Sequence, residues 1–529
     1  MVGAFFLNCS SIISLHKQYF MTDTDNQLTE DTLFGHPKGL YYLFFAELWE
    51  RFSFYGMRAL LTLYMVNVIF QELVERDFAA AAVYASYGSL VYASTVVGGK
   101  ISDSILGFRK SIFLGGILMA LGHFVLAIEN DYAFFLALGF IVVGNGFFKP
   151  NISTFVGSLY QEKDPRKDSG FTIFYMGINI GGWIAPLLCG WLGSAYGWHY
   201  GFGLAGFGML TGLLFFWRGI TSGVFGEKGL APSYDRLEEK ILGINRGNWI
   251  SLIAFLSAPI IAVLLASYKA IGSGGLFGDQ NIINIIFKIV GILILGYLAY
   301  ILSKVTFDER KKLFAAIAIT LFMTLFWGFH ELSGSVITLF AARNVSLTFM
   351  DAAQTNSLNS MFIIILALPI SWMWTALNKK KINPRTPYKF GFGLLIAGLS
   401  FFVLAISGNA ANQEGMVPFS YLLLMYFLIS IGELFMSPVG LSKITDLSPQ
   451  RIVAFMMGVW FLSSAYAFQL VGFIGKQLAI ESESSNIGGT ETLNTYIGGF
   501  DLISQYAIGA GILVLLLAPL LKKLMGNIH

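Results

Sequence analysis

Apolar residues are grouped along this chain into long blocks that short polar or charged segments separate. Most blocks contain about 20 residues or more, the length that one α-helix needs to cross a hydrocarbon core about 30 Å thick. The blocks occur as six, then two, then six, and this pattern predicts fourteen transmembrane helices. We place them at residues 39–70, 78–102, 111–128, 132–159, 170–192, 195–217, 248–268, 281–303, 312–341, 352–377, 389–407, 417–441, 451–475 and 498–521.

The composition supports a polytopic membrane protein. Of the 529 residues, 55% are apolar and only 12% are charged, against about 25% charged residues in an ordinary soluble protein. Two cysteines, Cys9 and Cys189, are too few for a disulfide framework or a structural metal site. No Walker A motif is present, so direct ATP use is not expected. We therefore expect no metal and no cofactor.

The distribution of basic residues predicts the orientation. Most of the 34 Lys and Arg residues lie in alternate loops and at the termini, for example Arg109, Lys110, Lys379, Lys380 and Lys381. Basic loops stay in the cytoplasm, and an even number of spans places both ends on one side. We expect both termini in the cytoplasm and the protein in a bacterial inner membrane. The net charge of +3 reflects this loop bias and needs no nucleic-acid partner.

The six, two, six pattern also predicts the domain organisation. We expect a cytoplasmic arm (1–38), a six-helix bundle (39–217), a linker with an extra two-helix hairpin (218–311) and a second six-helix bundle (312–529). Two bundles related by pseudo-symmetry, with a substrate site between them, are typical of a major facilitator fold. The hairpin is expected to lie outside the transport path.

The first span carries a dense set of ionisable residues, Glu47, Glu50, Arg51 and Arg58, with Tyr55 among them. At 100° per residue these side chains share an arc of about 140°, so they lie on one face of the helix. Charges inside a membrane cost on the order of 3 kcal/mol each and therefore face a cavity or one another. Two carboxylates beside one guanidinium make one of them a natural proton site.

The other deep charges are complementary between the two halves. Lys149 lies deep in the fourth span, whereas Glu331, with His330 beside it, and Glu433 lie in spans of the second half. Cations in one bundle would face acids in the other. This arrangement suits a zwitterionic substrate whose carboxylate meets Arg51, Arg58 and Lys149 and whose amine meets the acids.

These residues lie in motifs that resemble the proton-dependent oligopeptide transporter family, in its bacterial type, from about residue 36 to the end. The motifs occur in order along the chain: ExxERF with FYGMR at Glu47–Arg58, GFFKPN at Lys149, FYMGINIGG at Tyr175 and Asn179, FW with its glutamate at Trp327 and Glu331, GELFMSPVGLS at Glu433, and MMGVWFL at Trp460. A second-span tyrosine of the family pocket corresponds best to Tyr92, although Tyr84 and Tyr87 are near it in sequence.

The resemblance implies a symporter that imports di- and tripeptides together with protons by alternating access. It implies proton coupling by Glu47, Glu50, Arg51 and Lys149, and two gating pairs, Arg58 with Glu331 and Lys149 with Glu433. It also implies that the substrate contacts Arg51, Tyr55, Arg58, Tyr92, Lys149, Tyr175, Asn179, Trp327, Glu331, Asn359, Glu433, Ser437 and Trp460.

Three other functions remain as alternatives. A facilitator of the same fold for nitrate or another small metabolite would need cations but no acids for an amine. A membrane-embedded enzyme would need a nucleophile and base, a metal set or paired aspartates within the spans, and the aspartates lie in loops or at span ends. A channel would be blocked rather than lined by mixed charges. We therefore do not expect an enzyme.

Overall fold

The computed structural model describes residues 32–161, 164–267, 282–480 and 489–526. The chain divides into two compact units, Met1–Lys38 and Gly39–His529. The described part of the first unit contains two short antiparallel strands, β1 (Thr32–Leu33) and β2 (His36–Pro37). Cys9 and most of the expected cytoplasmic arm lie outside the described residues.

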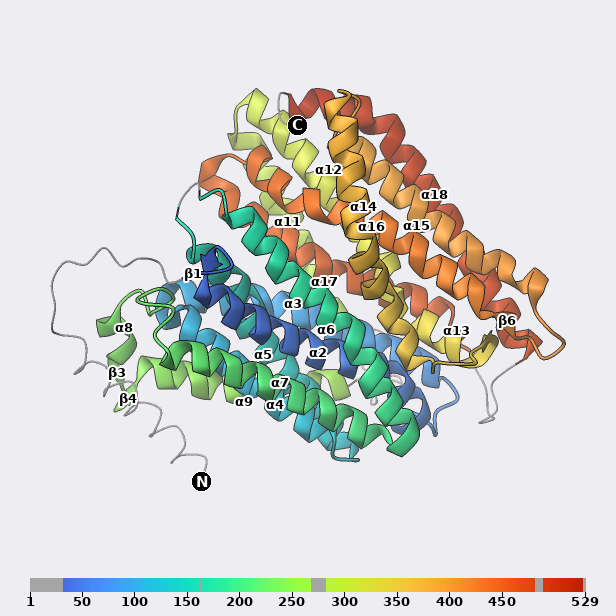
Figure 1. Ribbon diagram of the computed structural model, residues 1–529, viewed down its shortest axis with the longest axis horizontal. Helices are drawn as coiled ribbons and strands as arrows, with labels where there is room; N and C mark the ends of the chain where they lie inside the picture. The colour runs from blue at the N-terminus through green and yellow to red at the C-terminus, as the bar shows by residue number, and fades with distance from the viewer. Residues whose placement is uncertain (1–31, 162–163, 268–281, 481–488, 527–529) are drawn as a thin grey trace. The chain divides into compact units, whose positions relative to one another are not determined.

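The first six spans form one group of helices, coloured blue to green in Figure 1. Their bounds are α2 (Lys38–Tyr64), continued by the π-turn η1 (Met65–Ile69), α3 (Arg76–Ile101), η2 (Ser102–Leu106), α4 (Gly107–Leu126), α5 (Asp131–Ser158), α6 (Lys167–Tyr196) and α7 (Trp198–Thr221). Within this group α4 packs against α5 and α7, and α6 packs against α7.

The last six spans form the second group, coloured yellow to red in Figure 1. They comprise α12 (Phe307–His330) with η3 (Glu331–Gly334) and α13 (Val336–Asn344), η4 (Ala353–Asn356) with α14 (Ser357–Lys379), α15 (Thr386–Ile406) with η5 (Ser407–Ala410), α16 (Phe419–Leu447), η6 (Gln450–Ile452) with α17 (Val453–Gln477), and α18 (Thr490–Met525). Two short parallel strands, β5 (Val345–Ser346) and β6 (Val417–Pro418), join loops at one end.

Thirteen continuous stretches in the described residues are long and apolar enough to cross a membrane. One of them, Arg76–Leu126, has 51 residues, which as a single helix would extend about 77 Å, more than twice the hydrocarbon thickness. The stretch therefore makes two crossings, α3 and α4. They are separated at Gly107, whose φ of +74° favours glycine. The prediction of an all-α membrane protein with fourteen spans is confirmed.

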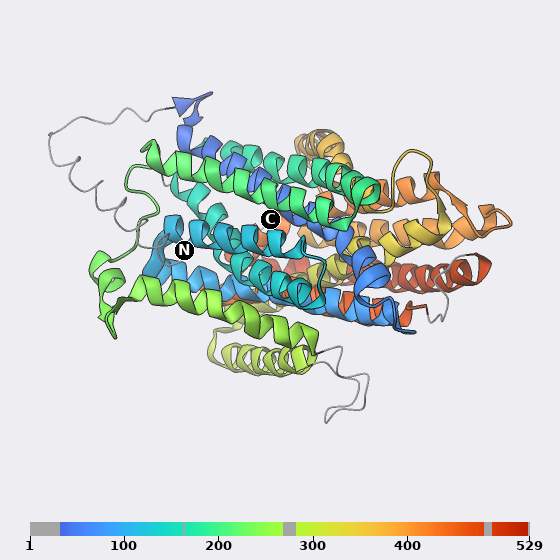
Figure 2. The ribbon, with the colours of Figure 1, turned by 90° about the horizontal axis from the view of Figure 1, so that it is seen from below.

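The region between the two groups contains more structure than the polar loop that the sequence predicts. It forms a short helix, α8 (Tyr234–Glu238), and a two-stranded hairpin, β3 (Lys240–Ile241) with β4 (Ile244–Asn245). The extra spans follow as α9 (Arg246–Ala266) and α11 (Ile282–Lys304). Figure 2 shows both helices at the edge of the helical groups, at the bottom of the view. Helix α9 packs against α5 and α11 packs against α17, so the hairpin touches both groups.

The two groups meet where α3 packs against α17 and where α6 packs against α14 and η4. The largest apolar cluster contains buried side chains from both groups, among them Met57, Tyr84 and Val471. Polar contacts also cross this interface. Ser89 donates a hydrogen bond to the carbonyl of Ala465 at 2.9 Å, and Gln469 donates one to Ser89 at 2.7 Å.

The seventh span is interrupted, whereas the sequence predicts one continuous helix over 312–341. Helix α12 ends at His330, and a 3-10 turn separates it from α13. A break at membrane depth frees backbone groups that must find other partners. Thr62 donates a hydrogen bond to the carbonyl of Gly334 at 2.7 Å, and Thr338 donates one to the carbonyl of Ser333 at 2.6 Å. The threonine of α2 therefore ties the break to the other group.

Gly334 is required at this break for a steric reason. A Cβ atom at this position would lie 2.1 Å from the hydroxyl of Tyr84 and 2.6 Å from Nε of Arg58. Both neighbours come from the opposite group, so only a residue without a side chain lets the turn approach them.

We expect Gly334→Ala to destabilise the protein by about 1–3 kcal/mol, the usual cost of overpacking a buried position. Gly296→Ala is the matched control, because a Cβ there meets no atom within 4 Å and alanine favours a helix. Thermal unfolding of the two purified variants in detergent measures the difference. A Gly334→Ala protein as stable as the Gly296→Ala protein would show that the contact at the break is not tight.

Candidate functional site

The first charged cluster lies on α2 and consists of Glu47, Glu50 and Arg51, all 3% exposed or less. The Nη2 atom of Arg51 donates a hydrogen bond to Oε1 of Glu50 at 2.7 Å. Its Nε atom lies 3.2 Å from Oε1 of Glu47 and also contacts Glu50. The second oxygen of Glu47 accepts no hydrogen bond from the described residues. Two carboxylates therefore share one guanidinium, and the cluster has one negative charge in excess when both are ionised.

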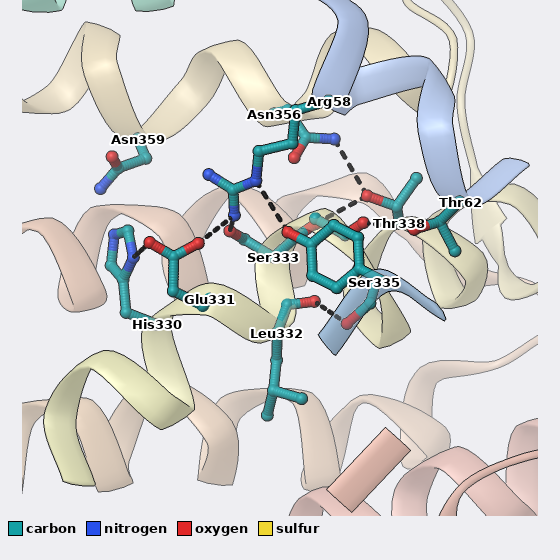
Figure 3. Close-up of polar contacts among 12 residues, drawn as sticks. Arg58, Thr62, His330, Glu331, Leu332, Ser333, Ser335, Thr338, Asn356 and Asn359 are labelled. Carbon is teal, nitrogen blue, oxygen red and sulfur yellow. Dashed lines mark hydrogen bonds and ion pairs between the residues drawn. The ribbon is translucent and has the colours of Figure 1, made fainter. Parts of the chain in front are cut away.

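Arg58, two turns further along α2, connects the two groups of helices. Its Nη2 atom lies 2.6 Å from Oε2 of Glu331 and 3.2 Å from the hydroxyl of Ser333, to which it donates. Its Nε atom donates a hydrogen bond to the hydroxyl of Tyr84 at 2.8 Å. Figure 3 shows the guanidinium between Glu331 and the serine hydroxyl. Both charged side chains are less than 10% exposed, so this ion pair is buried between the groups.

The interruption of the seventh span brings the glutamate to Arg58. Glu331 is the first residue of η3, and the turn that follows it allows close approach of the backbone to Tyr84 and Arg58. The sequence predicts the charge at this position but not the break that positions it.

A second acidic centre lies around Glu433 of α16. Asn359 of α14 donates hydrogen bonds to Oε2 of Glu433 at 3.1 Å and to the hydroxyl of Ser430 at 3.0 Å. The Nε2 atom of His330 lies 3.2 Å from the same carboxylate oxygen. Glu433 is 7% exposed, and its contacts are polar groups of the second bundle.

Lys149 does not pair with Glu433 in this structure, so the gating contact that the resemblance implies stays a prediction. Within the described residues it makes no ion pair shorter than 4.0 Å, and its Nζ atom lies 4.0 Å from the centre of the Tyr92 ring. It is near enough to Glu47 and Glu50 to interact electrostatically with both. Glu433 is instead held by Asn359 and His330 of its own bundle. The lysine therefore belongs to the α2 cluster in this conformation.

The two second-span tyrosines have different partners. The sequence favours Tyr92 as the pocket tyrosine, and Tyr92 does contact Lys149. Tyr84, which the sequence leaves as a second choice, lies at the other end of the site, where its hydroxyl accepts a hydrogen bond from Arg58. Two turns of α3 separate these residues, so one helix serves both cations.

The remaining expected substrate contacts surround these charges. The guanidinium of Arg58 lies 5.9 Å from the ring centre of Tyr55, and the ring of Trp327 meets His330 edge-on at 5.0 Å. Asn179 donates a hydrogen bond to the carbonyl of Tyr175, one turn earlier in α6. Tyr175 is 38% exposed.

Ser437 and Trp460 complete the expected set, and both are at least partly buried. Trp460 of α17 covers Gly440 of α16 so closely that a Cβ there would lie 2.3 Å from the indole.

The structure also contains a charged contact that the sequence does not predict. Arg343 makes a bidentate contact with Asp77 of α3, with distances of 2.5 and 2.8 Å, and donates a hydrogen bond to the hydroxyl of Tyr496 at 2.8 Å. Arg343 lies in the last turn of α13, and its side chain is 9% exposed. Asp77 also accepts a hydrogen bond from the backbone of Ile480 at 3.3 Å. We call this contact the outer pair.

The outer pair could not be recognised from the sequence, because both residues lie at span ends, where charges are common. The feature that could have indicated the contact is the place of each residue within its helix. Asp77 is in the first turn of α3, and Arg343 is in the last turn of α13. Opposite charges at the same end of two spans can meet.

Two six-helix groups with complementary buried charges at their interface define a membrane transporter of the major facilitator type. The model of the POT family matches residues 109–493. The chain therefore belongs to the POT family, the proton-dependent oligopeptide transporters. Membership of a transporter family confirms the expectation that the protein is not an enzyme.

Full-length relatives agree with this assignment. The chain is 35% identical over 522 residues to the uncharacterized transporter YclF of Bacillus subtilis (strain 168), with 96% of this chain and 100% of YclF covered. It is 35% identical over 513 residues to a di-/tripeptide transporter of Lactococcus lactis subsp. cremoris, with 95% and 99% covered.

Solved structures agree as well. A crystal structure of a peptide transporter POT in complex with sulfate superposes with a TM-score of 0.78 at 35% identity, covering 94% of this chain and 97% of that one. A mutant of a peptide transporter POT in complex with alafosfalin has a TM-score of 0.78 at 34% identity, with 94% and 98% covered.

We expect that reversing the charge of either Arg58 or Glu331 alone abolishes transport, because it places two like charges against each other in a buried site. The cost should exceed the about 3–5 kcal/mol of a buried pair that has lost one partner. The double variant Arg58→Glu/Glu331→Arg should recover part of the activity if mutual attraction holds the groups together. Transport by the single and double variants at equal expression measures this coupling. The control is the same exchange at Arg451 and Glu309, an exposed pair at 2.8 Å, which should change little. A double variant no better than the worse single variant would contradict the coupling.

We expect the outer pair to show the same pattern in an independent experiment. Asp77→Arg and Arg343→Asp should each reduce transport and lower thermal stability, and the double exchange should restore both in part. Tyr496→Phe removes one hydrogen bond, which the charged guanidinium of Arg343 donates, and should cost about 1.5–3 kcal/mol. Transport that is unaffected by either single reversal would show that transport does not require the outer pair.

Proposed function

We propose that this protein is a proton-coupled symporter that imports di- and tripeptides by alternating access. The observation that carries the proposal is the distribution of buried charge. The first bundle carries the buried cations Arg51 and Arg58 and the partly buried Lys149, beside the acids Glu47 and Glu50. The second bundle carries the buried acids Glu331 and Glu433. A peptide with free ends carries one charge of each sign, so its two ends would be held by opposite bundles.

We propose that the proton site is the cluster of Glu47, Glu50 and Arg51. Its excess negative charge is buried, and crowded carboxylates in a poorly solvated place favour protonation of one of them. The free oxygen of Glu47 is a suitable position for this proton. Lys149 lies within electrostatic reach of both carboxylates, so binding of a substrate carboxylate by the lysine would change their protonation.

We propose that Arg58 with Glu331 and the outer pair close one face of the transporter in the conformation described here. Both contacts join the first bundle to the second. The opposite gate would form when Lys149 leaves Tyr92 and reaches Glu433. The two gates would then be closed in alternation, as alternating access requires. On this basis the structure represents an inward-facing state.

We propose that the substrate side chains contact the aromatic and polar residues around these charges. Tyr55, Tyr92, Trp327 and Trp460 offer broad apolar surfaces of the kind that tolerates varied side chains. The polar positions are Tyr175, Asn179, Asn359 and Ser437. Asn359 already donates to Glu433 and would hold this carboxylate in position for a peptide amine.

The nitrate alternative is less well supported. Nitrate would be bound by cations alone, and two buried acids, Glu331 and Glu433, would repel it. Relatives that are named as peptide transporters match nearly the whole of this chain at 35% identity. We therefore favour a peptide.

We also propose the orientation and the location. Both termini would face the cytoplasm of a bacterium, because the basic loops lie on that side by the positive-inside rule. Arg58 and the outer pair would then lie toward the outside. This placement agrees with a gate that closes the external face.

Labelled dialanine uptake into liposomes that contain the purified protein tests the proposal. We expect no accumulation when the inside of the liposome is more acidic than the outside. An outside-acid gradient or an inside-negative potential should drive accumulation, since each co-transported charge gains about 2.3 kcal/mol per 100 mV. Glu47→Gln should keep dialanine exchange but lose accumulation, because an amide cannot titrate. Glu129→Gln is the matched control, since Glu129 pairs with His199 in an exposed position. Uptake of nitrate without uptake of dialanine would overturn the proposal.

A further inference from the structure

His330 has a position that the proposed transport cycle leaves unexplained. Its imidazole lies between two buried carboxylates, with Nε2 3.2 Å from Oε2 of Glu433 and Nδ1 4.0 Å from Oε1 of Glu331. The side chain is 8% exposed. Figure 3 shows the ring beside Glu331, on the side away from Arg58.

The aromatic neighbours fix the orientation of the imidazole. The ring of Phe326 stacks on it at 6.0 Å, and the ring of Trp327 meets it edge-on at 5.0 Å. Both residues are on the same face of α12, one turn earlier. The imidazole is therefore held toward the acids and is not free to rotate into solvent.

The charged groups around His330 come from several elements. Helix α16 contributes Glu433, η3 contributes Glu331, and α2 contributes Arg58, which is paired to Glu331. Helix α14 contributes the neutral Asn359. Helices α15, α17 and α18 also pack against α12, and within the described residues none of them makes an ion pair with His330.

The sum of these charges depends on the imidazole. Arg58 balances Glu331, which leaves Glu433 with one unbalanced negative charge when His330 is neutral. A protonated His330 makes the group neutral, and so does the ammonium group of a bound peptide. A buried site of low polarity does not favour both cations on one carboxylate.

We propose that protonated His330 is the resident counter-ion of Glu433, and that the amino group of an arriving peptide replaces it with release of one proton. This inference rests on the proposed function, since it assigns the amine end of the substrate. The peptide ammonium donates to the carboxylate of Glu433, the Nε2–H bond of the imidazolium breaks, and the proton leaves to water. His330 thereby determines how strongly the site requires a free amine.

The consequence is a pH dependence of binding with a defined sign. When His330 is protonated before binding, a peptide must displace its proton, so affinity rises with pH by up to about tenfold per unit. The dependence ends at a pH high enough for His330 to be neutral before the peptide binds. A peptide with a blocked amino group has no charge with which to replace the proton and should lack this dependence.

Calorimetric titration of the purified full-length protein tests the inference. Dialanine and N-acetyl-dialanine are titrated at several pH values in two buffers of different ionisation enthalpy, which gives the number of protons released. We expect dialanine to release up to one proton more than N-acetyl-dialanine. In His330→Gln this difference should disappear, and dialanine affinity at the acidic end should rise by about tenfold. Glutamine still donates to Glu433 but cannot titrate.

The control variant is His199→Gln, which removes a histidine paired with Glu129 outside the site and should leave proton release unchanged. Equal proton release in wild type and His330→Gln would overturn the inference and leave the proposed function intact. If His330→Gln does not fold, the wild type alone tests the inference through its two ligands. Release of equal numbers of protons on binding dialanine and N-acetyl-dialanine would overturn the inference. A wild type that binds neither ligand at any pH would instead overturn the proposed function.

Discussion

The ion pair between Arg58 and Glu331 is the interaction on which the arrangement of the two bundles depends. A charge inside a membrane is tolerated when an opposite charge and hydrogen bonds satisfy it. Arg58 obtains its partners from both bundles, Tyr84 from the first and Glu331 and Ser333 from the second. The pairing therefore couples the solvation of one side chain to the position of an entire bundle, and separating the bundles would leave two charges exposed to a poor solvent.

The interruption of the seventh span follows from the same requirement. In a continuous helix the backbone carbonyl groups would be hydrogen-bonded within the helix. Such a helix could not bring Ser333 and Gly334 against α2. The turn at η3 frees these groups, and Thr62 and Thr338 satisfy the carbonyls that it releases. Glycine at position 334 then removes the steric barrier between the turn and Arg58. The break costs helical hydrogen bonds but places a carboxylate at the interface.

The buried charges form two linked centres that differ in the ratio of acidic to basic groups. The α2 cluster has two acids for one arginine and Lys149 within electrostatic reach. The acidic centre has Glu433 with Asn359 and an imidazole in place of a permanent cation. In the proposed cycle both centres would take or release a proton as a substrate end arrives. Between them, Arg58 with Glu331 provides a contact whose stability depends on neighbouring charge. Protonation, substrate binding and bundle position can thus influence one another through contacts of a few ångströms.

The sequence by itself determined the class of fold, the spans and the identity of the charged residues, because apolar blocks of membrane length and charges within them are local features. The family resemblance also implied that Arg58 and Glu331 meet. Only the tertiary structure decided that Glu433 is held by His330 and Asn359, that Lys149 lies on Tyr92, and that Asp77 meets Arg343. These contacts join residues that are distant in the chain, and their partners depend on how the bundles are rotated in one conformation. A sequence specifies every conformation of a transporter at once, whereas each set of contacts belongs to one of them.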